Sequence, residues 1–264
     1  MKTVVAPLRG VGVLVTRPKH QAAALCELIR KQGGTAIPFP ALEIRPPAQP
    51  QQLQQIIVRL QEFNWAVFIS ANAVERALEQ ILAKRSWPTS LRIAVIGRRC
   101  AVALQRFGLV AEVCPQHQFN SEALLALPDM QAVSGQRIVI FRGNGGRELL
   151  ADTLRSRGAS VEYVEAYRRV RPETDTTELL GRWRLGEVSI VIVNSAETLR
   201  NLVEMLGEDG ASLLTRTPLL VVSERMLALA EELGFQNVPV VAANATDAAV
   251  MDALLAWKQA QAAC

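Results

Sequence analysis

Six short polar segments along the chain combine arginines, hydroxyls and small residues, the residue types that hold a negatively charged ligand. If each follows a strand of a parallel sheet, all lie at the sheet's carboxyl edge, where helix N-termini offer free N–H groups. A single segment of this kind indicates no more than a helix cap, since Ser, Thr and Asn are the usual capping residues. Because four of the six carry arginine, we expect an anion-binding cleft. The segments are Thr16-Arg17-Pro18, Ser70-Ala71-Asn72, Gly97-Arg98-Arg99, residues 142–147, Asn194-Ser195-Ala196 and Ser223-Glu224-Arg225.

The glycine-rich segment among these six is the most specific. Gly143, Gly145 and Gly146 allow close backbone approach to a ligand, and Arg142 and Arg147 flank them. The segment matches neither the G-x-G-x-x-G pattern nor a phosphate loop, because no Lys followed by Ser or Thr comes after it. We therefore expect a carboxylate here rather than a nucleotide.

Tyr163 and Tyr167 are the only tyrosines in the chain. Tyr167 precedes two arginines and admits two interpretations. It could be a packing residue with a solvated hydroxyl, as half-buried tyrosines commonly are. It could instead face the cleft as a proton donor. His20 and His117 lie in polar surroundings, and no Ser/His/Asp arrangement is recognisable.

Composition limits the class of protein. The 264 residues suggest roughly two domains. Half of them are hydrophobic, which excludes a disordered chain. A net charge of +4 is too small for a nucleic-acid-binding surface but suits a small polyanionic ligand. The cysteines are widely spaced and only two histidines accompany them, which argues against a metal site and for free thiols. They are Cys26, Cys100, Cys114 and Cys264.

Nothing in the sequence indicates a membrane segment. No apolar run approaches the ~18 residues of a membrane span. Pro7 and Arg9 interrupt the apolar N-terminal stretch, which makes it a poor signal peptide. We expect a cytoplasmic protein. The hydrophobic cores of two domains account for the apolar faces of the predicted helices and strands, so we expect a monomer.

Short apolar runs alternate with longer helical patterns, which is typical of α/β proteins. Most of the runs are continuous rather than alternating, as in strands covered on both faces of a parallel sheet. The predicted strands are 11–16, 35–44, 66–70, 93–97, 110–114, 137–142, 160–169, 188–194, 218–223 and 238–242.

The chain also repeats itself at a constant spacing of 125 residues. Arg17 and Arg142 end equivalent strands, and Ser70-Ala71 recurs as Ser195-Ala196. A constant offset over the whole unit predicts a duplication, with repeats at roughly 10–132 and 135–258.

The second strand of each repeat is unusual. Pro38 and Pro40 interrupt the first, and proline cannot donate to the interior of a sheet, so this segment lies at an edge or leaves the sheet. Its counterpart at 160–171 is too long and polar for one buried strand. We expect both to be extended connectors between two bodies.

Seven stretches of the chain form a recognisable pattern together: 13–18, 65–74, 92–97, 121–125, 143–150, 166–169 and 223–235. Their order and spacing, rather than any one motif, make the chain similar to the uroporphyrinogen-III synthase family over nearly its whole length.

The resemblance implies two doubly wound parallel-sheet domains of flavodoxin or Rossmann type. The first would combine residues 1–36 with 173–264, the second would span 48–160, and 37–47 and 161–172 would connect them. The duplicated units would be interleaved, each giving its first strand and helix to the other's sheet.

The resemblance also implies a substrate and a reaction. Hydroxymethylbilane, a linear tetrapyrrole with eight carboxylates, would lose water, invert ring D and close into uroporphyrinogen III without a metal or cofactor. A bilane-forming deaminase could hand this substrate over. Tyr167 matches the family's tyrosine, which would protonate the leaving hydroxyl. Cys100 stands where the family has a hydroxyl residue and is included among the expected substrate contacts. The segment Ser223-Glu224-Arg225 departs from the threonine-containing form that many family members have.

Two other functions remain open at this point. A non-catalytic two-lobed binding protein for a small polyanion would explain the expected cleft equally well, but it would need no proton donor. A nucleotide-dependent module would need a phosphate loop with lysine, which is absent from the sequence.

Overall fold

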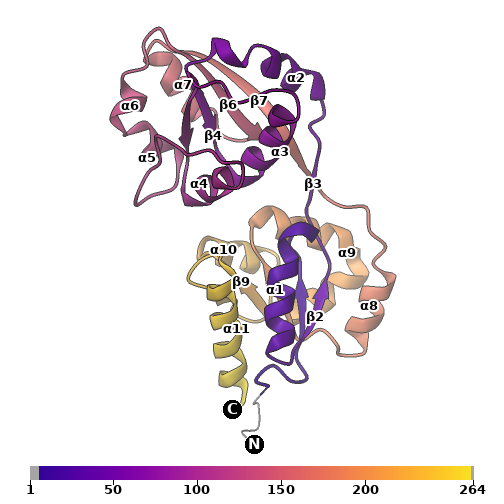
Figure 1. Cartoon of the computed structure of the whole chain (residues 1–264). Coiled ribbons are helices and arrows are strands. Elements are labelled where there is room, and N and C mark those ends of the chain that lie inside the picture. Colours follow the sequence, from indigo (N-terminus) through magenta and orange to yellow (C-terminus); the bar gives the residue numbers. More distant parts are fainter. Residues whose placement is uncertain (1–5, 263–264) are drawn as a thin grey trace, which may run out of the picture. The chain divides into compact units, whose positions relative to one another are not determined.

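A computed structural model describes residues 6–262, and the chain divides into two compact units (Figure 1). Unit 1 is formed by Met1–Glu43 with Val170–Cys264, and unit 2 by Ile44–Arg169. Residues 1–5 of the expected first domain, and Cys264, lie outside the described residues. Each unit contains one five-stranded sheet.

The sheet of unit 1 runs in the order β10-β9-β8-β1-β2. Each strand runs parallel to its neighbours, and β1 lies inside the sheet between β8 and β2. β2 is an edge strand, so its terminal Pro38 confirms the expectation that this proline-containing segment lies at an edge. The strands are β1 (Gly12–Val15), β2 (Thr35–Pro38), β8 (Ile190–Val193), β9 (Leu219–Val221) and β10 (Val240–Val241).

Helices cover both faces of this sheet. α1 (Lys19–Lys31) and α11 (Asp247–Ala262) lie side by side on one face (Figure 1). Leu25 and Ile29, four residues apart on α1, pack there against Val13 and Val15. The other face is covered by α8 (Thr177–Arg184), α9 (Ala196–Arg216) and α10 (Arg225–Glu232).

The sheet of unit 2 runs in the order β3-β7-β6-β4-β5. β7, β6, β4 and β5 are parallel to one another. The strands are β3 (Glu43–Arg45), β4 (Trp65–Phe68), β5 (Arg92–Val95), β6 (Arg137–Gly143) and β7 (Ser160–Val170).

Helices also cover both faces of the second sheet. One face holds α2 (Pro50–Val58), α3 (Ala71–Leu82) and α4 (Arg98–Gln105), with a 3-10 turn at Leu60–Glu62. Phe68 and Phe141 stack between these helices and the sheet with ring centroids 4.8 Å apart. The opposite face holds α5 (Ser121–Leu125), α6 (Pro128–Gln131) and α7 (Leu149–Ser156).

The prediction of two doubly wound, parallel α/β sheets is confirmed. The topology is also interleaved: β1-α1-β2 from the first half of the chain completes the sheet of β8–β10, while β6-α7-β7 from the second half completes the sheet of β4 and β5.

The structure corrects two expectations, the connector at 161–172 and the strand at 110–114. The predicted strand 160–169 is confirmed as β7 (Ser160–Val170), paired with β6, so most of the expected connector 161–172 belongs to a sheet. Its polar residues are tolerated because they are half-buried rather than sealed in the core. Residues 110–114, expected to form a strand, contribute only one bridge, between Val113 and Ala94.

Of the helices between residues 6 and 262, none combines the length and apolar character needed to cross a membrane.

Candidate functional site

Tyr167 and Ser70 meet at the carboxyl edge of the unit 2 sheet. The Tyr167 hydroxyl lies 3.1 Å from Ser70 Oγ. Ser70 caps α3, and its Oγ accepts a hydrogen bond from the N–H of Ala73 at 3.0 Å. Tyr167 is only 4% exposed. The phenol is therefore connected through one hydroxyl to the positive end of a twelve-residue helix.

A β-bulge aims Tyr167 at Ser70. Along β7, Val161 and Tyr163 pack on the face of α5–α7, so simple alternation would send Tyr167 to that same face. The register shifts between Arg142 and Gly143, which pairs Gly143 with Tyr167. Tyr167 consequently joins the core on the α3 side. Bulges commonly re-aim side chains beside functional sites.

Gly143 leaves the space that the tyrosine ring occupies. A Cβ on Gly143 would lie 2.6 Å from Tyr167 Cζ and 2.9 Å from its hydroxyl. The expectation was that a ligand would approach this glycine, but in the structure a side chain of the protein does so. Gly145 and Gly146 of the same loop have positive φ angles of 69° and 126° and border open space.

Both arginines of the glycine-rich loop already have anionic partners. Arg142 lies 4.1 Å from the ring centroid of Tyr163 and forms a 2.9 Å ion pair with Glu148. Arg147 binds Glu122 through both terminal nitrogens, and this pairing lowers the pKa of the Glu122 carboxyl. A substrate carboxylate would have to displace one of these glutamates.

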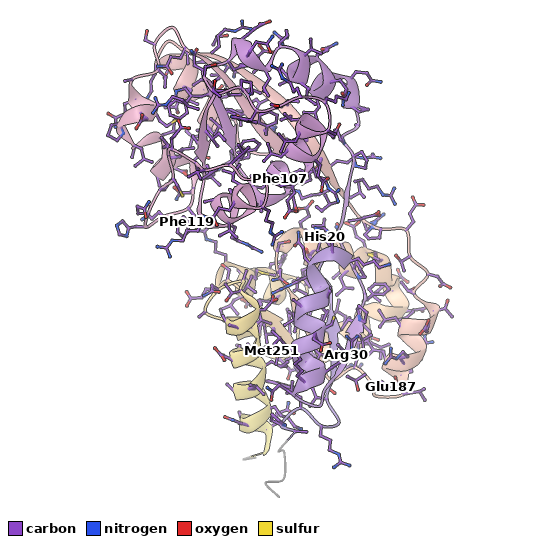
Figure 2. All side chains as sticks on the ribbon, in the orientation of Figure 1. His20, Arg30, Phe107, Phe119, Glu187 and Met251 are labelled. Atoms are coloured by element: carbon purple, nitrogen blue, oxygen red, sulfur yellow. The ribbon has the colours of Figure 1, made fainter. Side chains whose placement is uncertain are left out.

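The segment after β5 provides exposed cations beside an exposed ring. Arg98 and Arg99 are exposed, and within residues 6–262 neither forms an ion pair. The Arg98 guanidinium lies 5.8 Å from the ring centroid of Phe119, which is 49% exposed (Figure 2). Gly97 lets the Phe119 loop come close, because a Cβ there would lie 2.9 Å from Phe119 Cβ.

Cys100 is part of the hydrophobic core rather than of an accessible surface. It is 3% exposed and packs with Ala103 and Leu104 on the inner face of α4. Burial raises the pKa of its thiol to about 11. The Cys100 side chain, expected to contact the substrate, is instead covered by the core, because the third residue of this helix turns inward.

Arg17 in unit 1 is also internal and 7% exposed. Each guanidinium nitrogen has one partner: one forms an ion pair with Asp247, one donates to Asn194 Oδ1 at 3.0 Å, and one donates to the carbonyl of Ala245 at 3.3 Å. Arg17, expected to bind a substrate carboxylate, thus links the end of β1 to the start of α11 and the segment before it.

The remaining expected residues of unit 1 follow the neighbouring strands β8 and β9. Ser195 caps α9 and accepts the N–H of Thr198 at 3.1 Å, as Ser70 does with Ala73. Ser223 Oγ accepts the N–H of Arg225 at 3.4 Å, and the Arg225 side chain is exposed, without an ion pair among the residues described.

The structure thus joins only part of the expected set. Ser70, Gly143 and Tyr167 form one contact group, and Asn72 lies half-buried in the first turn of α3 beside it. Sequence reasoning missed Asn144, which contacts the backbone of this group. The position of Asn144 inside the glycine-rich loop could have identified it as a site residue. In the described part of the chain, no group of three or more His, Cys, Asp and Glu side chains could hold a metal ion.

Two interleaved α/β units with polar residues at the strand ends, one of which has a buried tyrosine at a helix cap, define a two-domain α/β protein. A family model described as "Uroporphyrinogen-III synthase HemD" matches residues 23–252. The chain is 39% identical to the uroporphyrinogen-III synthase of Escherichia coli K12 over 92% of its own length and all of that protein. It is 37% identical to that of Salmonella typhimurium LT2 over the same shares. The chain belongs to the uroporphyrinogen-III synthase family, a family of enzymes.

Solved structures agree on the fold. A mutant uroporphyrinogen III synthase from the extremely thermophilic bacterium Thermus thermophilus superimposes with a TM-score of 0.62 at 20% identity, over 96% of this chain and all of that one. The Helicobacter pylori 26695 enzyme gives 0.60 at 12% identity, over 94% of this chain and 99% of its own.

Proposed function

We propose that this chain cyclises hydroxymethylbilane to uroporphyrinogen III, with loss of water and inversion of ring D, and that Tyr167 is the proton donor. The observation that supports this role is the hydrogen bond between the Tyr167 hydroxyl and Ser70 Oγ at the cap of α3. It favours the proton-donor interpretation over a packing tyrosine with a solvated hydroxyl.

The hydroxymethyl group of the substrate leaves poorly as hydroxide. Transfer of the Tyr167 proton to its oxygen releases water as the carbon–oxygen bond breaks, while the pyrrole nitrogen supplies electrons to the carbon. The phenolate that remains can accept the hydroxyl hydrogen of Ser70, whose own oxygen is held by the Ala73 N–H. The helix N-terminus favours this negative charge.

Exposed cations supply the second requirement, which is restraint of the polyanionic chain. Arg98 and Arg99 follow β5, and Arg225 follows β9, each at the carboxyl edge of a parallel sheet. Holding a flexible substrate in one reactive geometry is a large part of catalysis, and here it decides which ring isomer forms.

The partners follow from the same proposal. The substrate would come from a bilane-forming deaminase in the cytoplasm. We further propose that the chain acts as a monomer, because each sheet has both faces covered by helices of its own chain.

The test supplies porphobilinogen and a bilane-forming deaminase and separates the products by chromatography. We expect the type III isomer, whereas type I alone, with tight binding of the bilane, would indicate a binding protein instead. Tyr167→Phe should lower turnover by more than about tenfold, as loss of a general acid does, with the fold intact.

Tyr163→Phe is the matched control. The Tyr163 hydroxyl is buried and lacks a hydrogen-bond partner in the region the structure covers, so removing it should leave turnover and stability unchanged or slightly raise stability. Equal loss of turnover in both variants would contradict the assignment to Tyr167.

A further inference from the structure

Asn144 holds the end of β7 in place with both its backbone and its side chain. Its N–H donates to the carbonyl of Tyr167 at 3.2 Å. Its Oδ1 accepts the N–H of Arg169 at 2.7 Å, and its Nδ2 donates to the Arg169 carbonyl at 3.4 Å. Tyr167 is therefore fixed at its own carbonyl and two residues further on.

These contacts fall where the regular pairing of the sheet stops. The register of β6 with β7 ends at the bulge that pairs Gly143 with Tyr167. Beyond it, Asn144 Oδ1 accepts the N–H of Arg169, the bond that the Asn144 backbone carbonyl would accept if the parallel ladder continued, and Asn144 Nδ2 donates to the Arg169 carbonyl. A bulge leaves the ladder locally disrupted, and here a side chain supplies the next bond.

We propose that Asn144 is a positioning residue for Tyr167: by replacing the missing rung of the ladder, it maintains the bulge that aims the phenol at Ser70. The catalytic part of this inference rests on the proposed function. Because both ends of its amide contact the protein backbone, we expect Asn144 to act through Tyr167.

The chain contains a matched control for this role. Asn64 Oδ1 accepts the N–H of Arg137 at 2.8 Å, at the start of β6, so the same side chain makes the same kind of bond at the other end of the strand. Asn64→Ala and Asn144→Ala should lower the thermal midpoint to similar extents. Only Asn144→Ala should lower kcat, by about tenfold, with KM little changed, because a proton donor misplaced by a fraction of an ångström loses much of its effect.

A double-mutant cycle separates positioning from general loss of structure. In a Tyr167→Phe background, Asn144→Ala should lower the remaining turnover less than about twofold, since no proton donor is left to misplace. An equal loss in both backgrounds, or a kcat for Asn144→Ala that matches Asn64→Ala, would overturn the proposal.

A second measurement needs no activity. With only two tyrosines in the chain, 3-fluorotyrosine labelling gives two fluorine resonances, which Tyr163→Phe assigns. Asn144→Ala should shift or broaden the Tyr167 resonance and leave that of Tyr163, while Asn64→Ala should leave both. An unchanged Tyr167 resonance refutes the positioning role even in an active enzyme. Type I product from the wild-type protein would instead refute the proposed function, whatever the resonances show.

Discussion

Replacing Gly143 by alanine tests whether the tyrosine ring must lie where the structure places it. The new Cβ would lie 2.6 Å from Tyr167 Cζ, while ordinary contacts begin near 3.4 Å, so the ring must retreat by about 0.8 Å. Gly143 is not among the glycines with positive φ, and alanine therefore fits its backbone without strain. We expect overpacking to lower the free energy of unfolding by about 1–3 kcal/mol. Displacement of the hydroxyl from Ser70 should lower turnover by about 10- to 100-fold.

Gly210→Ala in α9 provides the comparison. Its Cβ would also meet a first neighbour at 2.6 Å, Leu206 Cβ, in unit 1. Urea unfolding should show a similar loss of stability in both variants, and the isomer assay should show slow turnover only in Gly143→Ala. The reasoning fails if Gly143→Ala turns over at the wild-type rate, or if both variants lose turnover equally.

Two further predictions concern groups that the structure moves from the binding site to the framework. Asp247→Asn removes the counter-ion of the buried Arg17 guanidinium and should lower the free energy of unfolding by about 1–3 kcal/mol. Urea titrations measure this change, and a loss below about 0.5 kcal/mol would contradict a structural role for the ion pair. The pKa of the Cys100 thiol in the folded state, about 11, lies above its ordinary value of 9.0. Between pH 9 and pH 11 the thiol is therefore ionised in the unfolded chain but protonated in the folded one, and the free energy of unfolding falls as the pH rises. Unfolding at several pH values should show a shallower fall for Cys100→Ala, and identical slopes would show that the thiol is not responsible.

The fold class could be predicted because it depends on local patterns. Continuous apolar runs and their order along the chain indicate parallel strands covered on both faces. The constant 125-residue offset is reflected in the matching caps at Ser70 and Ser195, each of which accepts the N–H three residues on.

The details of the site depend on contacts between distant residues, which no local pattern reveals. The residue type of Arg17, and the family resemblance at Cys100, suggest ligand contacts. Yet Arg17 is neutralised by Asp247, 230 residues away, and Cys100 is turned inward by the helix that carries it. The long polar stretch that forms β7 gives no sign of the bulge opposite it, and this bulge determines on which face of the sheet the Tyr167 side chain lies. Gly143 was expected to admit a ligand, and the loop sequence gave no indication that the Tyr167 ring lies against this glycine.

The two units predicted to be repeats are not equivalent at the position of Tyr167. At the same offset, Leu42 corresponds to Tyr167, and Ser195 Oγ finds its partner in the hydroxyl of Thr198 at 2.8 Å. The capping serine of unit 2 thus contacts a tyrosine hydroxyl, whereas its counterpart in unit 1 contacts a threonine hydroxyl.

The place of β1 in its sheet affects how the protein is made on the ribosome. β1 lies between β2 and β8, and its pairing Val13↔Ile190 joins residues 177 positions apart. Unit 2 is continuous from Ile44 to Arg169, so all of its strands emerge before β8 has been synthesised. Nascent chains of intermediate length therefore carry a finished second unit together with an apolar first strand that has only β2 beside it, a species that chaperones recognise.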